Sequence, residues 1–589
     1  MAMNNIRVEI RQDGIGIATL DMPGRPFNVF SEDMMADFDR LIEIAATELT
    51  GLVICSGKPA FVAGADLAMI KDFANMRFDA DWQTMRDRFS YLGKLFRRLE
   101  KTPVPVVAAI NGLALGGGLE LAMACHARVC VDVASPILGL PEIILSLLPG
   151  AGGTQRLPRY VGLEKGLDML LGGAPVTPAE ALHLGLVDAV VSVDELLAKA
   201  IELVKATPAS ARWDSADWDL PDSDKALLSR ADWREWCLQS TGWNEQLHQL
   251  YPAVEAIIAC VEGGGALPID EACDIEWDVF VDLMSHPVAA NMVLTCFLNK
   301  TAASKWAAGD IAKEAPSLTT VAWCSEQQMP TRLAKKVKLV NELEAELLVV
   351  DGQQTCQKAC VRLINAADTV AVGADEERSA QIFYSGDFNR AEVVEVIAPA
   401  EISRAVVELV AAMGKTPLWS ITPGGGMNFM LTALRDYVAS SDKTPAELAM
   451  AAKAVDAEAL LQLVTPSVQA AEQPATAADK VTGLDMLGKV AIAALQSNIG
   501  RFEALDVLAV FGLCWPKWTG GPIAYLAMLQ RKELPADGLS LALVAALASL
   551  EQPLKIKACY ADEIELFRIG WKESDRSSNV TNDWTKRDF

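Results

Sequence analysis

Short strand-like runs alternate with helical patterns over the first 190 residues of the chain. The strand-like runs are RVEI, IGIATLDM, GLVICSG, PVVAAING and ARVCVDV. A strand repeats its apolar positions every second residue, whereas a helix repeats them about every 3.6 residues. The regular alternation of the two patterns therefore predicts an α/β layered domain over residues 1–190.

The pattern changes several times after this first domain. Residues 191–312 have a mostly helical pattern, and between 313 and 400 strand-like runs return as LTTVAW, ELLVVD, DTVAVG and VVEVI. After residue 401 the pattern is helical again. The stretch TPSVQAAEQPATAADK has the composition of a linker and predicts a division of the helical part into segments 401–480 and 481–589.

Charge and composition exclude several classes of protein. The 589 residues carry a formal net charge of −25, which would repel a nucleic-acid backbone. The N-terminal sequence alternates around a DG turn, which predicts a hairpin rather than a signal peptide, and no apolar run is long enough to predict a membrane span. The 12 cysteines are scattered: Cys356 and Cys360 lie one helical turn apart, and no second pair has the spacing of zinc ligands. We therefore expect reduced thiols, a cytoplasmic protein and no metal site.

The most unusual short stretch is GLALGGGLELA at residues 112–122, where three glycines precede a glutamate in an apolar run. A buried strand, Val106 to Ile110, leads into this loop, and Glu120 is expected early on the helix that follows. The loop lacks the Lys-Ser/Thr of a P-loop and the GxGxxG spacing of a dinucleotide site. A second loop of small residues, KPAFVAGADLAMI at 58–70, also opens a predicted helix after a strand.

A third stretch adds another carboxylate. Residues 138–159 read LGLPEIILSLLPGAGGTQRLPR and contain Glu142 beside an apolar run. Two loops that each present a backbone N–H group, together with two carboxylates in apolar surroundings, are suited to stabilising an enolate while a proton moves. The alternative is that the glycines permit close packing and that the glutamates are solvated.

These stretches resemble the enoyl-CoA hydratase/isomerase (crotonase) family. The motifs AFVAGADL, INGLALGGGLELAMAC, PEIILSLLPGAGGTQRLPR and PAEALHLGLVDAVV follow one another in the order and at the spacing of that family. The resemblance covers about a third of the chain and implies a spiral of ββα repeats. His126, where the family often has an acidic residue, is interpreted as structural together with the nearby Arg128.

The resemblance also implies roles for individual residues. The amides of Ala65 and Gly117 would form the oxyanion hole for a thioester carbonyl, and Glu120 and Glu142 would hold and activate one water. The residues implied near coenzyme A are Arg25, Ala63, Asp66 and Leu67. The implied reaction is hydration of a trans-2-enoyl-CoA in fatty-acid oxidation.

Two other functions stay open at this point. Within the same site, the chain could move a double bond from position 3 to position 2 of an enoyl-CoA. It could also be a non-catalytic subunit that binds acyl-CoA or a thiolase. Isomerases and hydrolases of the family often keep only one of the two glutamates, and this chain has both.

The second half resembles the 3-hydroxyacyl-CoA dehydrogenase part of the multifunctional α subunit of bacterial fatty-acid oxidation. The resemblance rests on GDFNRAEVVEVI, GKTPLW and ALDVLAVFGLCWPKWTGGPIAYL. It implies a reduced Rossmann-like segment at 313–400, followed by all-α dehydrogenase-like domains.

The dehydrogenase chemistry of that family is predicted to be lost. Ser325, Gln327 and Pro330 occupy the three positions of the phosphate-binding glycines, and Pro330 removes a backbone donor. The four histidines all lie at or before His286, so the catalytic histidine is absent. We expect no NAD cofactor, an acyl-CoA substrate, and either self-association or a thiolase subunit as partner.

Overall fold

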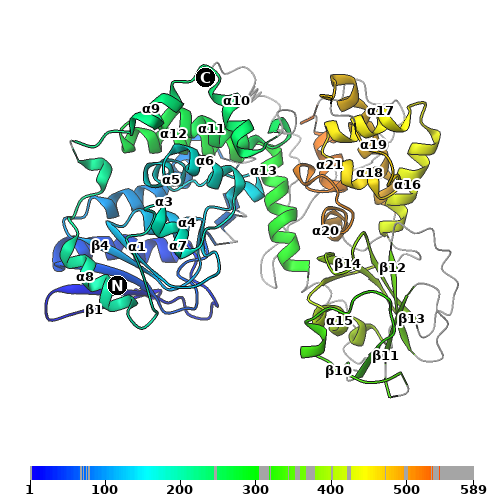
Figure 1. The fold of residues 1–589 in the computed structure, drawn as a ribbon, viewed down its shortest axis with the longest axis horizontal. Coiled ribbons are helices and arrows are strands. Elements are labelled where there is room, and N and C mark those ends of the chain that lie inside the picture. Colours follow the sequence, from blue (N-terminus) through cyan, green and yellow to red (C-terminus); the bar gives the residue numbers. More distant parts are fainter. Residues whose placement is uncertain are drawn as a thin grey trace.

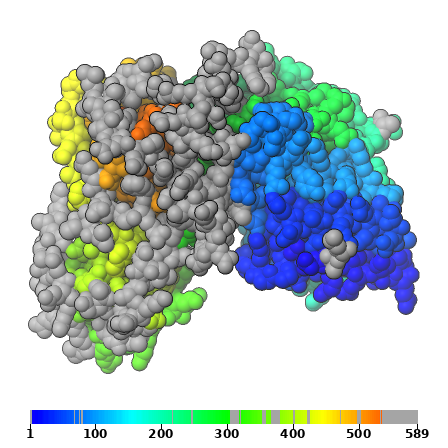
Figure 2. Space-filling model, turned by 180° about the vertical axis from the view of Figure 1, so that it is seen from behind, coloured from blue at the N-terminus to red at the C-terminus, as the bar shows by residue number. Residues whose placement is uncertain are grey.

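Two lobes make up the computed structural model, with the helix that begins at α13 running between them (Figure 1). The structure describes residues 3–303 except 67–68, 71, 74–75, 77–79, 216 and 244–247; residues 318 and 320–534 except 343, 346, 352–358, 366–378, 400–401, 421–425, 471–472, 497–501 and 532; and residue 543. From behind, the first lobe forms a continuous surface coloured from blue to green (Figure 2).

A six-stranded sheet of order β1-β2-β3-β4-β6-β8 is the centre of the first lobe, and its neighbours pair in parallel except for β1 and β2. The strands of the first lobe are β1 (Ile6–Ile10), β2 (Ile15–Leu20), β3 (Gly51–Ser56), β4 (Val106–Ile110), β5 (Ala114–Leu115), β6 (Ala127–Val131), β7 (Leu138–Gly139) and β8 (Ala189–Val191). The helices around them are α1 (Glu32–Glu48), α3 (Trp82–Glu100), α4 (Gly117–Met123), η1 (Glu142–Leu145), α5 (Gly153–Val161), α6 (Leu163–Gly172), α7 (Pro178–His183) and α8 (Leu196–Ala206). The strand runs read from the sequence are therefore confirmed.

Both faces of this sheet are buried, as the continuous apolar strand β4 requires. Val106 and Ala108 face the main core, whereas Val107 and Ala109 pack beneath α8 on the other face. This alternation follows from the two-residue period of a strand. Since β8 ends the sheet and α8 covers it, the first α/β unit continues past residue 190, where the sequence pattern placed its end.

Helices dominate residues 207–303, as predicted. They are η2 (Arg212–Asp214), α9 (Asp222–Leu228), α10 (Trp233–Thr241), η3 (His248–Leu250), α11 (Pro252–Gly264), α12 (Ile269–Ser285), α13 (Pro287–Met292) and the π-helical turn η4 (Val293–Asn299). α12 packs against α3, α5 and α11, so this segment is built onto the first lobe.

The second lobe contains a seven-stranded sheet of order β10-β9-β11-β12-β13-β14-β15, parallel except for the pair β13–β14. Its elements are β9 (Thr320–Trp323), η5 (Leu333–Lys335), β10 (Lys338–Leu339), β11 (Leu347–Asp351), β12 (Cys360–Asn365), β13 (Ser379–Tyr384), β14 (Val393–Ile397), α15 (Ser403–Ala412) and β15 (Thr416–Trp419). β15 belongs to this sheet, so the expectation of helix alone after residue 401 is wrong. The run DTVAVG lies outside the described residues, and β12 and β13 were not predicted.

Helices α16–α21 pack above this sheet (Figure 1). They are α16 (Gly426–Ser440), α17 (Pro445–Ala454), α18 (Glu458–Gln462), α19 (Ala477–Gln496), α20 (Phe502–Gly512), η6 (Lys517–Thr519) and α21 (Pro522–Gln530). α19 packs against both α16 and α17. The predicted boundary at residue 480 lies inside α19, because the last residues of the linker-like stretch already belong to this helix. Since α19 packs against helices from before that boundary, the helices do not separate into two packing units there.

Polar contacts join the two lobes. The Tyr251 hydroxyl donates to Asp456, the Asn291 amide donates to the carbonyl of Thr519 over 3.2 Å, and Lys300 pairs with Glu392. Among the described residues, no single helix is long and apolar enough to cross a membrane; α12 and the helix Pro287–Ala303 reach that length and composition only when taken together across a 73° bend.

Candidate active site

The structure brings the three loop stretches of the sequence analysis together. Val62 forms a bridge with Ala114, and β5 pairs with β7, so the loop 58–66, the glycine triplet and the start of the third stretch are joined side by side. The Gly116 amide donates to the Gly139 carbonyl over 2.9 Å and extends this pairing. Backbone hydrogen bonds between segments distant in sequence thus build one wall of a site.

A cavity of 440 Å³ lies against this wall. Glu120 and Glu142 both line it, as do Ala65 and Gly117, which the resemblance implies as the oxyanion hole. Glu120 comes from the short helix α4 and Glu142 from the first residue of η1. The four residues predicted to act together therefore share one cavity.

The amides of Ala65 and Gly117 are free to bind an oxygen. Phe30 forms backbone hydrogen bonds with the two neighbours of Ala65: the Phe30 amide donates to the Gly64 carbonyl, and the Phe30 carbonyl accepts from the Asp66 amide. The Ala65 amide takes part in neither bond. Gly117 is the first residue of α4, where an amide has no partner within the helix. Within the described part of the chain, neither amide has a hydrogen-bond acceptor. Such unused donors beside carboxylates are what an oxyanion site requires.

Glu120 is held by the turn that begins α5. Its Oε1 accepts hydrogen bonds from the amides of Ala151 and Gly153, each over 2.8 Å, and the side chain is buried. Burial raises the pKa of Glu120 above its usual value, and the two amides oppose that rise because they favour the charged form. The result is a fixed carboxylate with a proton affinity above that of a surface glutamate.

Glu142 has different surroundings. Its Oε2 is buried and accepts no hydrogen bond from the residues that the structure describes. Burial, and then repulsion from the Glu120 carboxylate, raise the pKa of Glu142 well above its usual value. The two glutamates therefore differ in how strongly each holds a proton, which is the condition for one base and one acid in the same cavity.

Two glycines allow the carboxylates to come this close to the backbone. Gly116 has a φ of +54°, and a Cβ there would lie 2.7 Å from Oε1 of Glu142. A Cβ on Gly153 would lie 2.8 Å from Oε1 of Glu120. Any side chain at either position would displace a carboxylate, which accounts for glycine at both places.

The rest of the cavity is mostly apolar. Phe89 contacts Phe280 with ring centroids 5.3 Å apart, and Met284, Cys296 and Phe297 add to the lining. Phe280 and Met284 come from α12, and Cys296 and Phe297 from η4, both beyond the first predicted domain. These residues could not be predicted from the sequence, because a helical apolar pattern indicates burial but not the cavity to which it contributes.

The structure describes three of the four residues implied near coenzyme A. Ala63 lines the cavity. Arg25 forms an ion pair with Asp66, and its side chain is 46% exposed, whereas Asp66 is buried. Leu67 lies outside the described residues. The sequence analysis missed Arg88, a basic residue that lines the cavity and pairs with Glu32.

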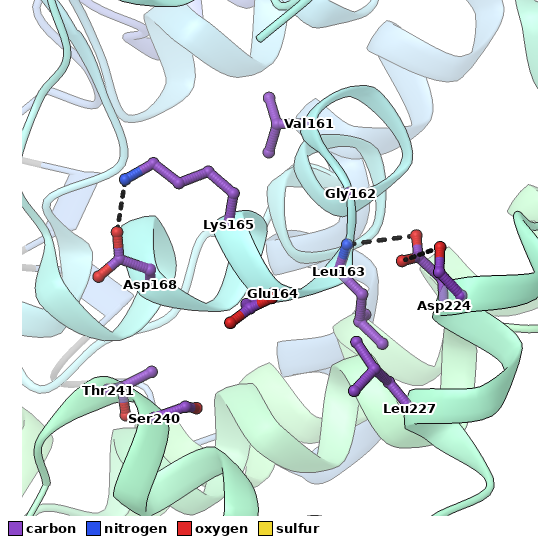
Figure 3. A pocket seen from close by; sticks show the side chains of 11 residues that line it. Val161, Gly162, Leu163, Glu164, Lys165, Asp168, Asp224, Leu227, Ser240 and Thr241 are labelled. Atoms are coloured by element: carbon purple, nitrogen blue, oxygen red, sulfur yellow. Dashed lines mark hydrogen bonds and ion pairs between the residues drawn. The ribbon is translucent and has the colours of Figure 1, made fainter.

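A second hollow, of 500 Å³, lies between α6, α9 and α10 (Figure 3). Its polar groups are engaged with one another: the Leu163 amide donates to Asp224 over 3.2 Å, and Lys165 pairs with Asp168 over 2.5 Å. Asp224 thus caps the first turn of α6, and the hollow does not combine two buried carboxylates as the first cavity does. The first cavity is the candidate active site.

His126 has a structural role, as the sequence analysis expected. Its Nδ1 accepts from the Val106 amide over 2.9 Å, its Nε2 contacts the Glu100 carbonyl, and burial lowers its pKa. Arg128 is buried and binds Tyr160 and Asp188 nearby. Over the described ranges, no group of three histidine, cysteine or acidic side chains is arranged to hold a metal ion.

Comparison with known families identifies the site-bearing domain. Residues 11–214 match the enoyl-CoA hydratase/isomerase family. The N-terminal third of this chain is an enoyl-CoA hydratase/isomerase domain. Its match begins in the β1–β2 turn and ends after α8, in agreement with the sheet and its covering helix.

Curated relatives share more than this domain. The fatty acid oxidation complex subunit alpha of Shewanella halifaxensis is 38% identical over 306 residues, which cover 51% of this chain and 42% of that protein. The subunit of the same name from Shewanella frigidimarina is 46% identical over 290 residues, covering 48% and 39% of the two chains. The alignments therefore span about two fifths of the length of these relatives.

A solved enoyl-CoA hydratase from Bacillus anthracis is 34% identical and is covered over 76% of its length, against 34% of this chain, with a TM-score of 0.30.

Proposed function

We propose that the chain is an enoyl-CoA hydratase that adds water to a trans-2-enoyl-CoA to give a 3-hydroxyacyl-CoA. The observation that carries this proposal is one apolar cavity lined by Glu120, Glu142, Ala65 and Gly117, in which the amides of Ala65 and Gly117 have no acceptor within the described part of the chain. A hydratase needs two proton-transfer groups and a site for developing negative charge, and the cavity supplies all of these.

The surroundings of the two glutamates support a different role for each in this proposal. Glu120, held as a carboxylate by two amides, is the base that takes a proton from water as its oxygen bonds to C3. Glu142, whose pKa is raised further, keeps its proton and gives it to C2. Between these events the thioester oxygen carries the negative charge, and the amides of Ala65 and Gly117 stabilise it. The proton that Glu120 took from water then passes to Glu142, which restores both starting protonation states, so that one water is added overall.

The cavity indicates an acyl-CoA with an apolar chain. Phe89, Phe280 and Phe297 present a surface that a hydrocarbon chain can cover at a gain of about 0.8 kcal/mol per buried CH₂ group. Arg25 and the backbone of Ala63, which lines the cavity, are proposed to lie beside coenzyme A. Arg25 is already paired with Asp66, so this proposal requires the arginine to share its charge between the carboxylate and a phosphate.

Loss of absorbance at the enone-thioester band tests the proposal with crotonyl-CoA as substrate. Hydration removes the conjugated double bond, and chromatography then identifies 3-hydroxybutyryl-CoA as the product. A 3-enoyl-CoA that is converted while crotonyl-CoA is not would identify an isomerase instead. No conversion of either substrate at enzyme excess would favour the binding-only function.

We further propose that the dehydrogenase-like half binds no NAD and oxidises no hydroxyacyl-CoA. Asp351 ends β11, next to β9, where an acidic residue of a dinucleotide-binding fold would bind the ribose. Here the chain itself occupies that carboxylate, because the Ser325 hydroxyl and the Glu326 amide each donate to Asp351 over 2.5 Å. A ribose hydroxyl would have to share these oxygens with both donors.

The phosphate side of the same site is also altered. In a dinucleotide-binding fold the first strand leads through a glycine turn into a helix whose N-terminus binds pyrophosphate. In this chain β9 is followed by an irregular loop containing Gln327 and Pro330, and then by the single turn η5. These features support the loss of the cofactor site.

The names of the curated relatives support a protein partner. They are called subunits of a fatty acid oxidation complex, so we propose that this chain assembles with a thiolase subunit or with itself. Light scattering of the purified chain, alone and mixed with a bacterial thiolase, would give the mass that decides between these assemblies and a monomer.

A further inference from the structure

A third buried carboxyl group, that of Glu276, contacts the same backbone turn that binds Glu120. Glu276 lies on α12, outside the matched family domain, and has no exposed surface. Its Oε1 accepts from the Gly152 amide over 2.5 Å, and its Oε2 accepts from the Thr154 amide over 2.9 Å and from the Thr154 hydroxyl. A buried acid with three donors on it is a built feature of the core.

These contacts alternate with those of Glu120 along one turn of backbone. The amides of Ala151 and Gly153 donate to Glu120, whereas those of Gly152 and Thr154 donate to Glu276. The turn is therefore held between two carboxylates on opposite sides. If the second carboxylate were removed, the amides that fix Glu120 would lose the counterpart that orients them.

We propose that Glu276 is a positioning residue: it holds residues 151–154 so that two amides fix Glu120, and its charge acts on Glu142. The inference rests on the proposed hydratase function, because it assigns a role to Glu120 in that reaction. It also gives the helical extension a direct influence on the catalytic domain, since α12 supplies the carboxylate.

Charge supports this inference. Burial, followed by repulsion from Glu120, raises the pKa of Glu276 to about 8, and the Glu276 charge in turn contributes to the raised pKa of Glu142. Near pH 7 Glu276 is mostly protonated, and above pH 8 it becomes an additional negative charge beside the cavity. The ionisable groups that face this cluster from the elements packed around it are Arg97 and Glu100 on α3, Arg156 and Arg159 on α5, Cys260 on α11 and Cys273 on α12.

Two substitutions at Glu276 separate its effect on the position of residues 151–154 from the effect of its charge. E276Q keeps the shape and a neutral group, so near pH 7 its kcat should stay within about threefold of the wild type. E276L leaves the amides of Gly152 and Thr154 without acceptors, so its kcat should fall by about tenfold or more, with KM for crotonyl-CoA little changed. E271Q, on the exposed side of α12, is the control and should behave as the wild type.

The pH profile gives a readout that a purely structural role would not move. A negative neighbour raises the pKa of a carboxylic acid, so removing the Glu276 charge lowers the pKa of Glu142. The alkaline limb of kcat in E276Q should therefore move to lower pH by about half a unit to one unit, while the acidic limb stays in place. Superimposable profiles for E276Q and the wild type would overturn the charge part of the proposal.

Hydrogen exchange tests the positioning part without catalysis. In E276L the amides of residues 151–154 should exchange at least tenfold faster than in the wild type, while unchanged exchange of the amides in β3 and β4 shows that the fold is retained. Unchanged exchange would overturn the proposal. If E276L does not fold, the E276Q profile decides. If the wild type hydrates no enoyl-CoA, the proposed function has failed, and exchange still decides whether Glu276 orders the turn.

Discussion

The two α/β sheets of this chain differ in what their loops do with backbone amides. After the strands of the first sheet, the amides of Ala65 and Gly117 lie beside a cavity and have no acceptor among the residues that the structure describes. After β9 of the second sheet, the Glu326 amide and the Ser325 hydroxyl are bound to Asp351 of the same sheet. The first sheet keeps donors for a ligand, and the second uses its donors within its own fold.

This difference shows why two sheets of similar architecture need not support the same chemistry. Both sheets are mostly parallel, and both could present loops at the carboxyl ends of their strands. A ligand oxygen competes with the protein's own carboxylates for the same N–H and O–H donors. The protein's carboxylates have an advantage, because an intramolecular hydrogen bond has no association entropy to overcome. Binding capacity therefore depends on which groups the loops leave unsatisfied.

The largest expected effect concerns the two cavity glutamates. E120Q and E142Q each keep the side-chain shape but cannot exchange a proton, so kcat for hydration of crotonyl-CoA should fall by about 10²–10⁴-fold. The absorbance assay measures this, and E48Q at the exposed end of α1 is the matched control. Near-normal turnover in either variant would refute the two-carboxylate mechanism.

The next effect isolates an unused amide of the first sheet. G117P removes the N–H group at the first position of α4, where proline is compatible with a helix, and G117A adds a Cβ while keeping the N–H. The kcat of G117P should be about 10²–10³-fold below that of G117A. Equal rates for the two variants would mean that the Gly117 amide does not stabilise the reacting oxygen.

A smaller effect should appear in the pH profile of the wild type. Glu120 acts ionised and its pKa is raised, so kcat/KM should fall about tenfold per unit as pH drops through that raised value. Glu142 acts protonated, so activity should also fall as pH rises through its own raised pKa. A rate that remains constant down to the usual range of a surface glutamate would contradict this assignment.

A modest effect should follow from narrowing the apolar end of the cavity. F297W adds volume on η4, where the native side chain lines the cavity. We expect kcat/KM for decenoyl-CoA to fall about tenfold and that for crotonyl-CoA to change less than twofold, because only the longer chain reaches the added ring. Equal losses for both substrates would place the acyl chain elsewhere.

We expect the second sheet to bind no NADH. Titration of the chain with NADH by calorimetry should give no binding heat, and S325G/Q327G/P330G, which restores the three glycine positions, should also give none, because no pyrophosphate-binding helix follows β9. Crotonyl-CoA titrated into the same preparation is the positive control. Micromolar binding by the wild type would show that the divergent loop still holds the cofactor.

Sequence patterns predicted which helices and strands are present better than they predicted where the domains end. The apolar run of β4 and its neighbours predicted the sheet, because buried parallel strands have continuous apolar runs. The domain ends at 190 and 400 missed α8 and β15, since each returns to a sheet whose other strands lie far away in sequence. A local pattern does not record which sheet a later element joins.

The sequence by itself determined which chemical groups are present: the two glutamates, the glycine loops that let backbone approach them, non-glycine residues at 325, 327 and 330, and no histidine after His286. Only the tertiary structure decided how these groups meet. It placed Phe280 and Phe297 from later helices in the cavity, set Glu276 behind Glu120, and turned Asp351 toward its own loop. The physical reason is that burial and hydrogen bonding depend on distances in space, which residue order alone does not specify.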